Sequence, residues 1–295
     1  MSTDPSLRPR RSVLYMPGAN ERALEKAKAI PADSLILDLE DAVAPNAKAD
    51  ARDRVCAAAA SGDYGHREVA IRANSRDTEW HDDDVTAIAA AGPAAIVVPK
   101  VDEIADVHAV EAALEKAGAP DHTAIWAMVE TPFAMLHAEE IAASSDRLTV
   151  LVMGTNDLAK ELRAQHVPGR QPLLTGLGLC LLAARATGKV ILDGVYNDIK
   201  NADGFLAECI QGHQMGFDGK TLIHPSQVEP CNDVFAPTSE AVAGAQEIID
   251  AFEEAEREGR GVVTVNGRMI ENLHVDEARR TLAQADAIES LRTET

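Results

Sequence analysis

Residues 148–158 read LTVLVMGTNDL, and this stretch decides how the chain folds. Its first half is apolar and ends at Gly154, after which three polar residues follow, Thr155, Asn156 and Asp157. A short run of branched apolar residues that stops at glycine and small polar residues is typical of a buried strand. The stretch therefore predicts a strand that delivers Asp157 to the loop at its carboxyl end.

A second stretch has the same design. Residues 125–129, IWAMV, are apolar and lead directly to Glu130, which Thr131 and Pro132 follow. Because the carboxyl ends of parallel strands meet at one edge of a sheet, both acids are expected there. We hypothesise that Glu130 and Asp157 together hold a divalent cation. The alternative is that each acid caps the helix that follows its strand.

The two carboxylates define which metal the site would take. All-oxygen ligands with open positions suit Mg²⁺ or Mn²⁺, with water and substrate completing the shell. Zinc is not expected, because no His or Cys stands at ligand spacing near either acid. A Mg²⁺ ion held in this way commonly chelates a 2-oxo or 2-hydroxy acid and polarises its carbonyl oxygen.

The same pattern of apolar runs recurs along the chain. Six more candidate strands are residues 12–16, 35–39, 68–73, 94–98, 189–192 and, more weakly, a segment within 217–223. Helical segments alternate with them, among them 20–29 with Asn20 as the N-cap, 84–91, 104–118 and 177–188. Eight strands that alternate with helices, without a long linker, predict a (β/α)8 TIM barrel.

A doubly wound open sheet is the rival fold. Its dinucleotide fingerprint is missing, because the turn after the first strand reads PGANERA and not GxGxxG. A lone GxG at 176–178 has no strand in front of it. The barrel is therefore the better prediction.

In a barrel every strand opens on the same face, so the polar residues at the strand ends should converge there: Glu40, Asp41, Arg72, Lys100, Glu130, Asp157, Asp193 and His224. Arg72 suits a fork for a substrate carboxylate or a developing enolate, and an internal ion pair with Glu40 or Asp41 is the alternative. The segment LDLEDAV has more acids than one metal needs, so some of them would orient Arg72 or metal-bound water. Asp38 is expected to be structural.

Two other strand-end residues receive weaker roles. Lys100 precedes an acidic segment, so it is expected to be solvated or ion-paired and not a Schiff-base lysine. His224 has no acid or serine partner in GKTLIHPSQV that would form a triad, which favours packing or substrate contact. Ser226 as a nucleophile is the weaker alternative.

The composition limits the possible partners. The chain has 295 residues, 46% of them hydrophobic but only 3% aromatic, which fits one barrel with an aliphatic core. A formal charge of −20 argues against nucleic acid and against an anionic membrane surface. An anionic substrate would need local cations, and six stand close together near the N-terminus: Arg8, Arg10, Arg11, Arg22, Lys26 and Lys28.

These cations could bind the phosphates of a large anionic cofactor through Lys26 and the helix N-terminus near Asn20, and a solvated face is the alternative. The four cysteines form no CxxC motif and the N-terminus has no signal-peptide core, which predicts reduced thiols in a cytoplasmic protein. No apolar run approaches the ~18 residues of a membrane span.

The barrel is expected within residues 1–236, and residues 237–295 form a C-terminal extension. An acidic helix over 239–258, a hairpin turning at Asn266-Gly267 and a last helix over 275–291 are expected there. A capping flap is the simpler interpretation. The other is a lid that brings Glu271 and His274 to an active site, either its own or that of a neighbouring subunit.

Seven ordered motifs together resemble the citrate lyase beta-subunit-like family, which includes malyl-CoA, citramalyl-CoA and β-methylmalyl-CoA lyases and a related malyl-CoA thioesterase. They are RSVLYMPGANERALEKA, LILDLEDAVAPNAKADAR, EVAIRANS, AIWAMVETP, VMGTNDLAKEL, LDGVYNDIK and GFDGKTLIHPSQV. The resemblance runs from about residue 11 to about residue 280. It implies a TIM barrel of the pyruvate/phosphoenolpyruvate type that uses Mg²⁺ and assembles as a trimer or hexamer.

The resemblance also implies roles by position. Glu130 and Asp157 match the metal ligands, and Arg72 matches the arginine on the 2-oxo-acid carboxylate. The remaining matches are the acidic neighbours Glu40 and Asp41, the CoA contacts Tyr15, Asn20, Lys26, Ile223 and His224, and Asn156 among the substrate-binding residues. In the family the C-terminal segment closes over the next subunit's site and offers a carboxylate.

That carboxylate corresponds here to Glu271 in GRMIENLH, where the lyases are expected to have Asp, and Asn20 stands where some relatives have Arg. The implied reaction is a reversible retro-Claisen cleavage of a 3-hydroxyacyl-CoA, such as malyl-CoA or citramalyl-CoA, to an acyl-CoA and a 2-oxo acid. Glu271 would protonate the enolate. One alternative is a malyl-CoA thioesterase in which Glu271 positions water. Another is a citrate lyase beta subunit that needs an acyl-carrier partner.

Overall fold

The structure is a computed structural model that describes residues 7–259 and 263–293. The chain separates into two compact units. One unit spans Arg10–Phe235, and the other consists of residues 7–9 together with the described residues of Ala236–Thr295. Each unit is described by itself below.

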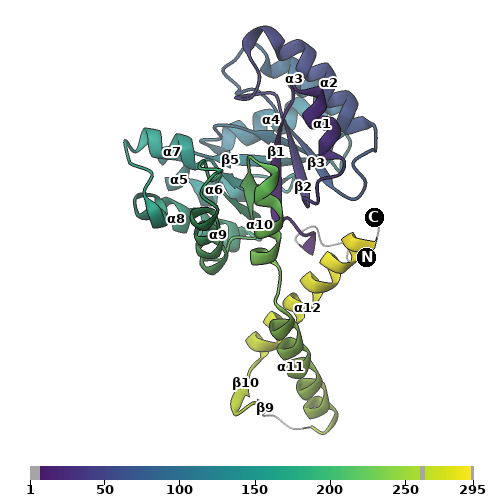
Figure 1. The fold of residues 1–295 in the computed structure, drawn as a ribbon, viewed down its shortest axis with the longest axis vertical. Coiled ribbons are helices and arrows are strands. Elements are labelled where there is room, and N and C mark those ends of the chain that lie inside the picture. The colour runs from purple at the N-terminus through teal and green to yellow at the C-terminus, as the bar shows by residue number, and fades with distance from the viewer. Residues whose placement is uncertain (1–6, 260–262, 294–295) are drawn as a thin grey trace. The chain divides into compact units, whose positions relative to one another are not determined.

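Arg10–Phe235 form a closed barrel of eight parallel strands in sequence order (Figure 1). The strands are β1 Ser12–Pro17, β2 Ser34–Asp38, β3 Glu68–Arg72, β4 Ala95–Val98, β5 Ala124–Val129, β6 Leu148–Met153, β7 Val190–Asp193 and β8 Gly219–Leu222. The barrel closes where Ser12 of β1 pairs with Lys220 of β8. The predicted (β/α)8 TIM barrel is confirmed, and each predicted strand agrees within a few residues.

Helices follow the strands and cover the outside of the barrel (Figure 1). They are α1 Glu21–Ala27, α2 Lys48–Ala60, α3 His81–Ala91, α4 Ile104–Lys116, α5 Pro132–Leu136, α6 Ala138–Ala143, α7 Thr155–Glu161, α8 Leu174–Thr187, α9 Ala202–Met215 and α10 Val228–Phe235. Short 3₁₀ turns are η2 Pro45–Ala47, η3 Pro168–Leu173 and η4 Pro225–Gln227. The Asn20 side chain accepts a hydrogen bond from the Ala23 N–H, so it caps α1 as predicted.

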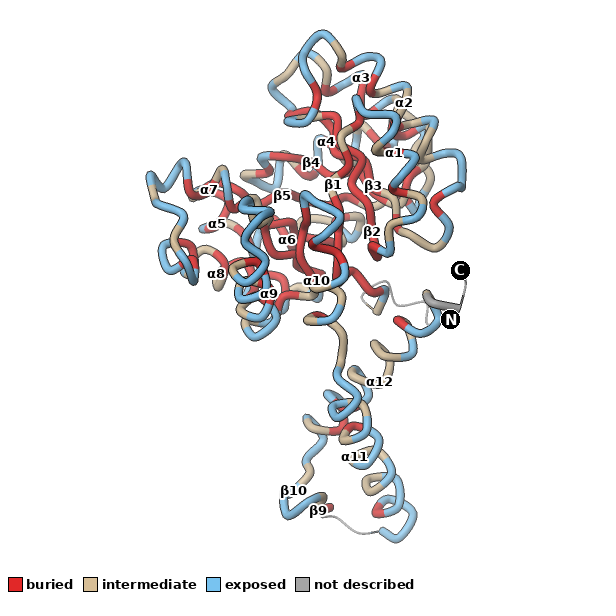
Figure 2. Tube along the Cα trace, viewed as in Figure 1, coloured by how far each residue is buried: buried red, intermediate tan, exposed pale blue. Residues whose placement is uncertain are grey.

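The core has two layers because strand side chains alternate between the two faces of the sheet. Inside the barrel a small apolar cluster includes Val13, Trp126 and Val150, and a larger cluster fills the space between strands and helices. Figure 2 shows the strands as the buried part of this unit. The aliphatic composition of these clusters agrees with the low aromatic content of the chain.

The amino ends of the strands are tied by buried ion pairs. The Arg10 guanidinium lies 2.6 Å from a Glu68 carboxylate oxygen, and that of Arg11 lies 2.8 Å from one of Asp33. Arg10 and Arg11 directly precede β1, so they lie at the end of the barrel opposite the strand carboxyl ends. The prediction that the whole N-terminal cation cluster serves an anionic ligand is therefore wrong for these two, because buried carboxylates already neutralise them.

The second unit pairs α11 Ser239–Arg257 with α12 Asn272–Thr293. Between them lies an antiparallel hairpin of β9 Val263–Val265 and β10 Arg268–Ile270. Asn266 and Gly267 have φ of 48° and 78°, the left-handed conformation that a tight hairpin turn requires. The predicted helix, hairpin and helix are present, while residues 260–262 of the expected connection lie outside the described residues. None of the helices in the described part of the chain is long and apolar enough to cross a bilayer.

Candidate active site

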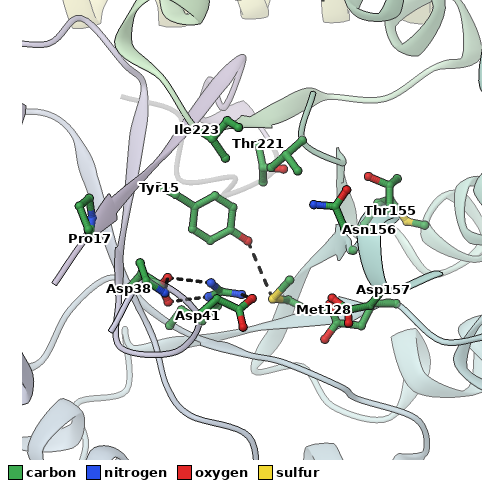
Figure 3. Close-up of a pocket in the computed structure, with 16 residues that line it drawn as sticks. Tyr15, Pro17, Asp38, Asp41, Met128, Thr155, Asn156, Asp157, Thr221 and Ile223 are labelled. Atoms are coloured by element: carbon green, nitrogen blue, oxygen red, sulfur yellow. Dashed lines mark hydrogen bonds and ion pairs between the residues drawn. The ribbon is translucent and has the colours of Figure 1, made fainter. Parts of the chain in front are cut away.

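The strand carboxyl ends surround a cavity of about 400 Å³, called the barrel-mouth cavity below (Figure 3). Seven of the residues selected from the sequence line it: Tyr15, Asp41, Arg72, Glu130, Asn156, Asp157 and Ile223. In the view of Figure 3, Asp38 and Asp41 lie on one side of the cavity and Asn156 and Asp157 on the other. The barrel thus brings acids and an arginine from distant parts of the sequence to one small space.

Glu130 directly follows β5 and is only 3% exposed. Its Oε1 atom accepts a hydrogen bond of 2.8 Å from the Lys100 main-chain N–H. Asp157 lies in the first turn of α7, where the helix dipole favours a carboxylate. Glu130 does not cap α5, since the Thr131 side chain does so by accepting from the Ala134 N–H. The capping alternative therefore fails for Glu130.

The electrostatic setting of Glu130 favours a cation beside it. The pKa of Glu130 is raised to about 7, mainly by burial and also by the nearby charges of Asp157 and Glu40, while the hydrogen bond from the Lys100 N–H lowers it. Gly154 makes room for this carboxylate, because a Cβ atom at Gly154 would lie 2.2 Å from Glu130 Oε2. A cation between two close carboxylates would relieve their repulsion.

The donor set fits Mg²⁺ with water and substrate as further ligands. Both acids offer oxygen, and within residues 7–259 and 263–293 no group of three or more His, Cys, Asp or Glu side chains could hold a metal. An all-protein cage is therefore not formed by the described residues. Mg²⁺ commonly binds through one or two carboxylates and keeps its other positions for water and substrate oxygens.

Arg72, the last residue of β3, is 7% exposed and held by acids. Its Nε and Nη2 atoms each donate to Asp38 at 2.7 Å, and its Nη1 lies 2.6 Å from Glu40 and 3.4 Å from Asp41. The Tyr15 ring lies 4.9 Å from the guanidinium carbon. An arginine has five N–H donors, and four of them meet these acids, which leaves one Nη2 N–H for a ligand in the cavity. Both roles weighed for Arg72 are therefore compatible.

Asp38 and Glu40 form the support of this guanidinium. Asp38 also accepts from the Glu40 and Ala42 N–H groups at 2.9 and 3.1 Å, which is the structural role expected for it. Burial raises the pKa of Glu40 to about 7; the Arg72 charge lowers it, and Asp41 and Asp38 raise it. Although burial opposes its charge, Asp38 and the other neighbours raise the pKa of Arg72 above its ordinary value, so this arginine stays charged.

Some predicted residues lie away from the barrel-mouth cavity. Asn20 and Lys26 belong to the α1 region, and Lys26 is exposed. Asp193 was expected at the mouth, which is wrong: it is fully buried, 2.6 Å from Arg170 and 3.0 Å from Lys220. Its carboxylate faces α9 outside the barrel wall, where Gly212 leaves space for it.

His224 does have a serine partner, which corrects the expectation from the sequence. Its Nδ1 atom lies 2.8 Å from Ser226 Oγ and also accepts the Ser226 N–H at 3.2 Å. These bonds cap the short turn η4, and no acid orients the ring in the bonds that the structure records. The pair is therefore a turn cap and not a catalytic triad.

Glu271 and His274 belong to the second unit. The Glu271 N–H donates to His274 Nδ1 at 3.0 Å, at the start of α12. Their action at an active site stays a prediction.

The sequence analysis missed several residues of the cavity wall. The Met128 sulfur lies 3.9 Å from the Tyr15 hydroxyl, which donates to it. Met128 stands two residues after Trp126 on the same strand, and this spacing indicates that both side chains point into the barrel. Asn197 exchanges hydrogen bonds of 3.2 and 2.7 Å with Asn156 and lines a neighbouring cavity of about 420 Å³. No local signal marks Asn197, since the pairing depends on how two loops meet.

Comparisons with known proteins show which family the chain belongs to. The family model for HpcH/HpaI aldolase/citrate lyase matches residues 11–225, and that for a C–C bond lyase of the TIM-barrel fold matches residues 173–288. A (3S)-malyl-CoA thioesterase of Cereibacter sphaeroides is 55% identical, covering 95% of this chain and 96% of the relative. A citrate lyase subunit beta of Escherichia coli is 38% identical, covering 95% of this chain and 94% of the relative.

A solved structure is similar over the same span. It is the protein CitE of Mycobacterium tuberculosis in complex with magnesium, acetoacetate and coenzyme A, 28% identical with a TM-score of 0.75, covering 93% of this chain and 97% of that one. The family model covers well over half of the chain, and the curated relatives span nearly all of it. This chain is thus an enzyme of the HpcH/HpaI aldolase/citrate lyase family.

Proposed function

We propose that this enzyme hydrolyses (3S)-malyl-CoA to malate and CoA with the help of Mg²⁺. The observation that carries the proposal is the 55% identity, over nearly the full chain, to a relative named (3S)-malyl-CoA thioesterase. The carbon–carbon lyase, which the sequence motifs favoured, has support only at the level of the family. The thioesterase alternative is therefore the better one.

The residues of the barrel mouth suit a short hydroxy acid. Glu130 and Asp157, which both line the cavity, would hold the Mg²⁺ ion. The magnesium bound in the CitE structure supports the choice of this metal. When bound, the ion would supply a Lewis acid for the hydroxyl and carboxylate of the malyl group. Arg72 keeps one N–H donor beyond its contacts with acids, and its charge would bind and orient the malyl carboxylate. The cavity of about 400 Å³ accommodates an acyl group of this size.

Hydrolysis needs a base for water, and we assign it to Glu271. Its carboxylate would take a proton from water as the water oxygen attacks the thioester carbon. The C–S bond then breaks, and the thiolate of CoA receives a proton to leave as the free thiol. Closure of the second unit over the barrel mouth of a neighbouring subunit in a trimer or hexamer would place Glu271 there. Tyr15, Asn20, Lys26, Ile223 and His224 are the proposed contacts to CoA.

The lyase is retained as the second candidate because of the support around Arg72. An arginine fixed by Asp38 and Glu40 beside two metal-binding acids also suits stabilisation of a departing 2-oxo acid. In that reaction the C2–C3 bond of malyl-CoA breaks, the hydroxyl proton is lost, and the acetyl-CoA enolate is protonated by Glu271. The cytoplasmic location expected from the sequence stays a prediction.

Product analysis separates the candidates. Purified protein is mixed with Mg²⁺ and (3S)-malyl-CoA, and the products are identified by chromatography. Malate with free CoA supports the thioesterase, whereas glyoxylate with acetyl-CoA supports the lyase. A protein that leaves malyl-CoA intact contradicts both and directs attention to another acyl chain or an acyl-carrier partner. Asp157→Ala should abolish the Mg²⁺-dependent turnover while the protein stays folded.

A further inference from the structure

Lys48, the first residue of α2, is a buried cation that the proposed reaction does not use directly. Its side chain is 6% exposed overall, and its Nζ atom donates to three acceptors. These are the main-chain oxygens of Leu39 and Glu40 at 2.7 and 2.8 Å and the Asn74 Oδ1 atom at 2.5 Å. An ammonium has three N–H donors, so all of them are used.

The three acceptors lie on both segments that hold Arg72. Leu39 and Glu40 directly follow β2, and the Leu39 N–H donates to the Arg72 main-chain oxygen at 2.9 Å. Asn74 lies two residues after Arg72, at the end of β3. Lys48 therefore ties the loop that carries Glu40 and Asp41 to the segment that carries Arg72.

Asn74 is itself held firmly from the outside of the barrel. Its main-chain and side-chain N–H groups donate to Asp84 Oδ2 at 2.9 and 2.6 Å, and its main-chain oxygen lies 2.8 Å from His81 Nδ1. Asp84 is fully buried and accepts from Arg52 Nε at 2.7 Å. These bonds thus connect helices α2 and α3 to the segment that follows Arg72.

The positive charge of Lys48 also acts on the acids that surround Arg72. Three acids, Asp38, Glu40 and Asp41, contact the single guanidinium of Arg72. The Lys48 charge interacts with those acids too, although it shares no short ion pair with them in the bonds recorded for its Nζ atom. A second cation at this position lowers the repulsion among the acids and lets the loop stay close to Arg72.

We propose that Lys48 is a positioning residue for Arg72: by holding residues 39–40 against Asn74, it keeps the guanidinium in the orientation that binds the substrate carboxylate. Arginine would not replace it, because a planar guanidinium directs its donors into a plane, whereas the ammonium reaches three acceptors from one point. The inference rests on the proposed function for the identity of the substrate. It does not depend on whether the C–S or the C–C bond breaks.

The test compares Lys48→Met with Lys189→Met. Lys189 is the matched control: its Nζ atom also donates to a main-chain oxygen, that of Ser145 at 3.0 Å, but it precedes β7 at the opposite end of the barrel. The probe is oxalate, a dianion that mimics an enolised 2-oxo acid, bound in the presence of Mg²⁺ and measured by titration calorimetry. Inhibition by free CoA, which lacks the acid that Arg72 would bind, is the second readout.

If Lys48 positions Arg72, Lys48→Met raises both the Kd for oxalate and the KM for malyl-CoA by roughly 10- to 100-fold. A small displacement of a binding group in a site has an effect of this size. CoA inhibition stays unchanged, and Lys189→Met matches the wild type in all three measurements. A purely structural role would lower the amount of active protein, so kcat would fall while KM and oxalate affinity stay the same. That result overturns the proposal.

A second variant is needed in case Lys48→Met does not fold. Oxalate binding also separates the positioning role of Lys48 from the proposed thioesterase function. If Lys48→Met does not fold, Lys48→Arg carries the same expectation, because it keeps the charge but not the three bonds. Wild-type protein that binds oxalate but leaves malyl-CoA intact contradicts the proposed function, while the calorimetric comparison still tests Lys48. Wild-type protein that binds no oxalate with Mg²⁺ overturns the positioning role.

Discussion

Arg72 combines two demands that usually conflict, since it is nearly fully buried and must still face a ligand. Its bidentate bond to Asp38 and its contact with Glu40 compensate for burial of the charge. A buried ion pair of this kind is sensitive to the loss of either partner. The geometry also fixes the plane of the guanidinium, and with it the direction of the N–H group that remains for a ligand.

We predict that Arg72→Lys lowers kcat/KM by roughly 100-fold, because a lysine cannot donate to Asp38 and a substrate carboxylate in one plane. Steady-state kinetics with malyl-CoA measures the effect. Arg185→Lys is the control, since Arg185 forms a comparable pair with Asp218 at 2.8 and 3.0 Å but is exposed. Equal activity of the Arg72→Lys variant and the control would refute the role of Arg72.

Gly154 gives a direct test of the metal site. A Cβ atom there would lie 2.2 Å from Glu130 Oε2, so Gly154→Ala must displace the carboxylate. We expect a loss of Mg²⁺ affinity of at least about 10-fold by calorimetry, the size reported for disturbing a metal's surroundings. Gly178→Ala is the control, because nothing lies within 4 Å of a Cβ atom at that helical position. Unchanged Mg²⁺ affinity in Gly154→Ala would speak against Glu130 as a ligand.

Glu40 should make stability depend on pH. Burial raises its pKa from an ordinary 4.5 to about 7, so the folded state binds a proton more tightly than the unfolded state. The free energy of unfolding should therefore fall as pH rises from 4.5 to 7, with a contribution from Glu40 of up to about 3 kcal/mol. Urea unfolding at pH 5 and pH 8 measures the fall. Glu40→Gln should make the free energy of unfolding depend less on pH. If that dependence is the same in the variant and the wild type, the pKa of Glu40 is not raised in the folded state.

At the scale of elements, strand periodicity decided what the sequence could predict. Runs such as 148–153 and 125–129 are apolar on both faces, as strands of a helix-covered parallel sheet must be, so the barrel and the acids at its mouth followed from pattern alone. The N-cap Asn20 and the Asn266-Gly267 turn followed from local chemistry. Asp193, by contrast, looks like any other strand-end acid in the sequence.

What separates Asp193 from Glu130 is the direction of the side chain, which depends on register and on the helix outside. Asp193 faces α9, where it meets Lys220 and Arg170, and Glu130 lines the barrel-mouth cavity. The buried pairs of Arg10 and Arg11 were hidden for the same reason: their partners Glu68 and Asp33 are distant in sequence. Only the closed barrel shows which charges meet.

Lys220 and Asp193 form a buried ion pair between the barrel wall and α9, and we predict that their contributions to stability are not additive. Lys220 is fully buried and donates to Asp193 at 3.0 Å and to Glu208 of α9 at 2.8 Å. Lys220→Met should destabilise the fold by about 3–5 kcal/mol, because it removes one of the two cations, Lys220 and Arg170, that balance the buried Asp193 carboxylate. The double variant with Asp193→Leu should cost less than the sum of the single variants in chemical unfolding. Additive costs would mean that the pair does not act as a unit.

At the scale of the whole molecule, the strong negative charge bears on how the substrate is held. A chain with a net charge of −20 repels an anionic CoA ester at long range, so binding has to come from local groups. At the barrel mouth these would be Arg72 and, under the proposed function, a Mg²⁺ ion held by Glu130 and Asp157. The second unit, which carries Glu271, was predicted as a lid, and its role is open to a test in solution.

We predict that the lid acts between subunits. Glu271→Gln and Asp157→Ala should each be inactive, and a mixture dissociated and reassembled together should regain part of the activity. Recovery follows because some mixed oligomers combine an intact barrel mouth with an intact lid from a neighbour. The activity of each variant treated alone is the control. A mixture that stays inactive, although mass spectrometry shows mixed oligomers, would place Glu271 in its own subunit's site or outside the reaction.

The central claim, that the barrel mouth directs water to a CoA thioester, is tested most directly by turnover of (3S)-malyl-CoA in ¹⁸O-labelled water with Mg²⁺. Direct hydrolysis predicts malate with one ¹⁸O atom in the carboxylate released from CoA, formed together with free CoA and lost in Asp157→Ala. Glyoxylate and acetyl-CoA as the products, without labelled malate, would contradict the claim and establish the lyase instead.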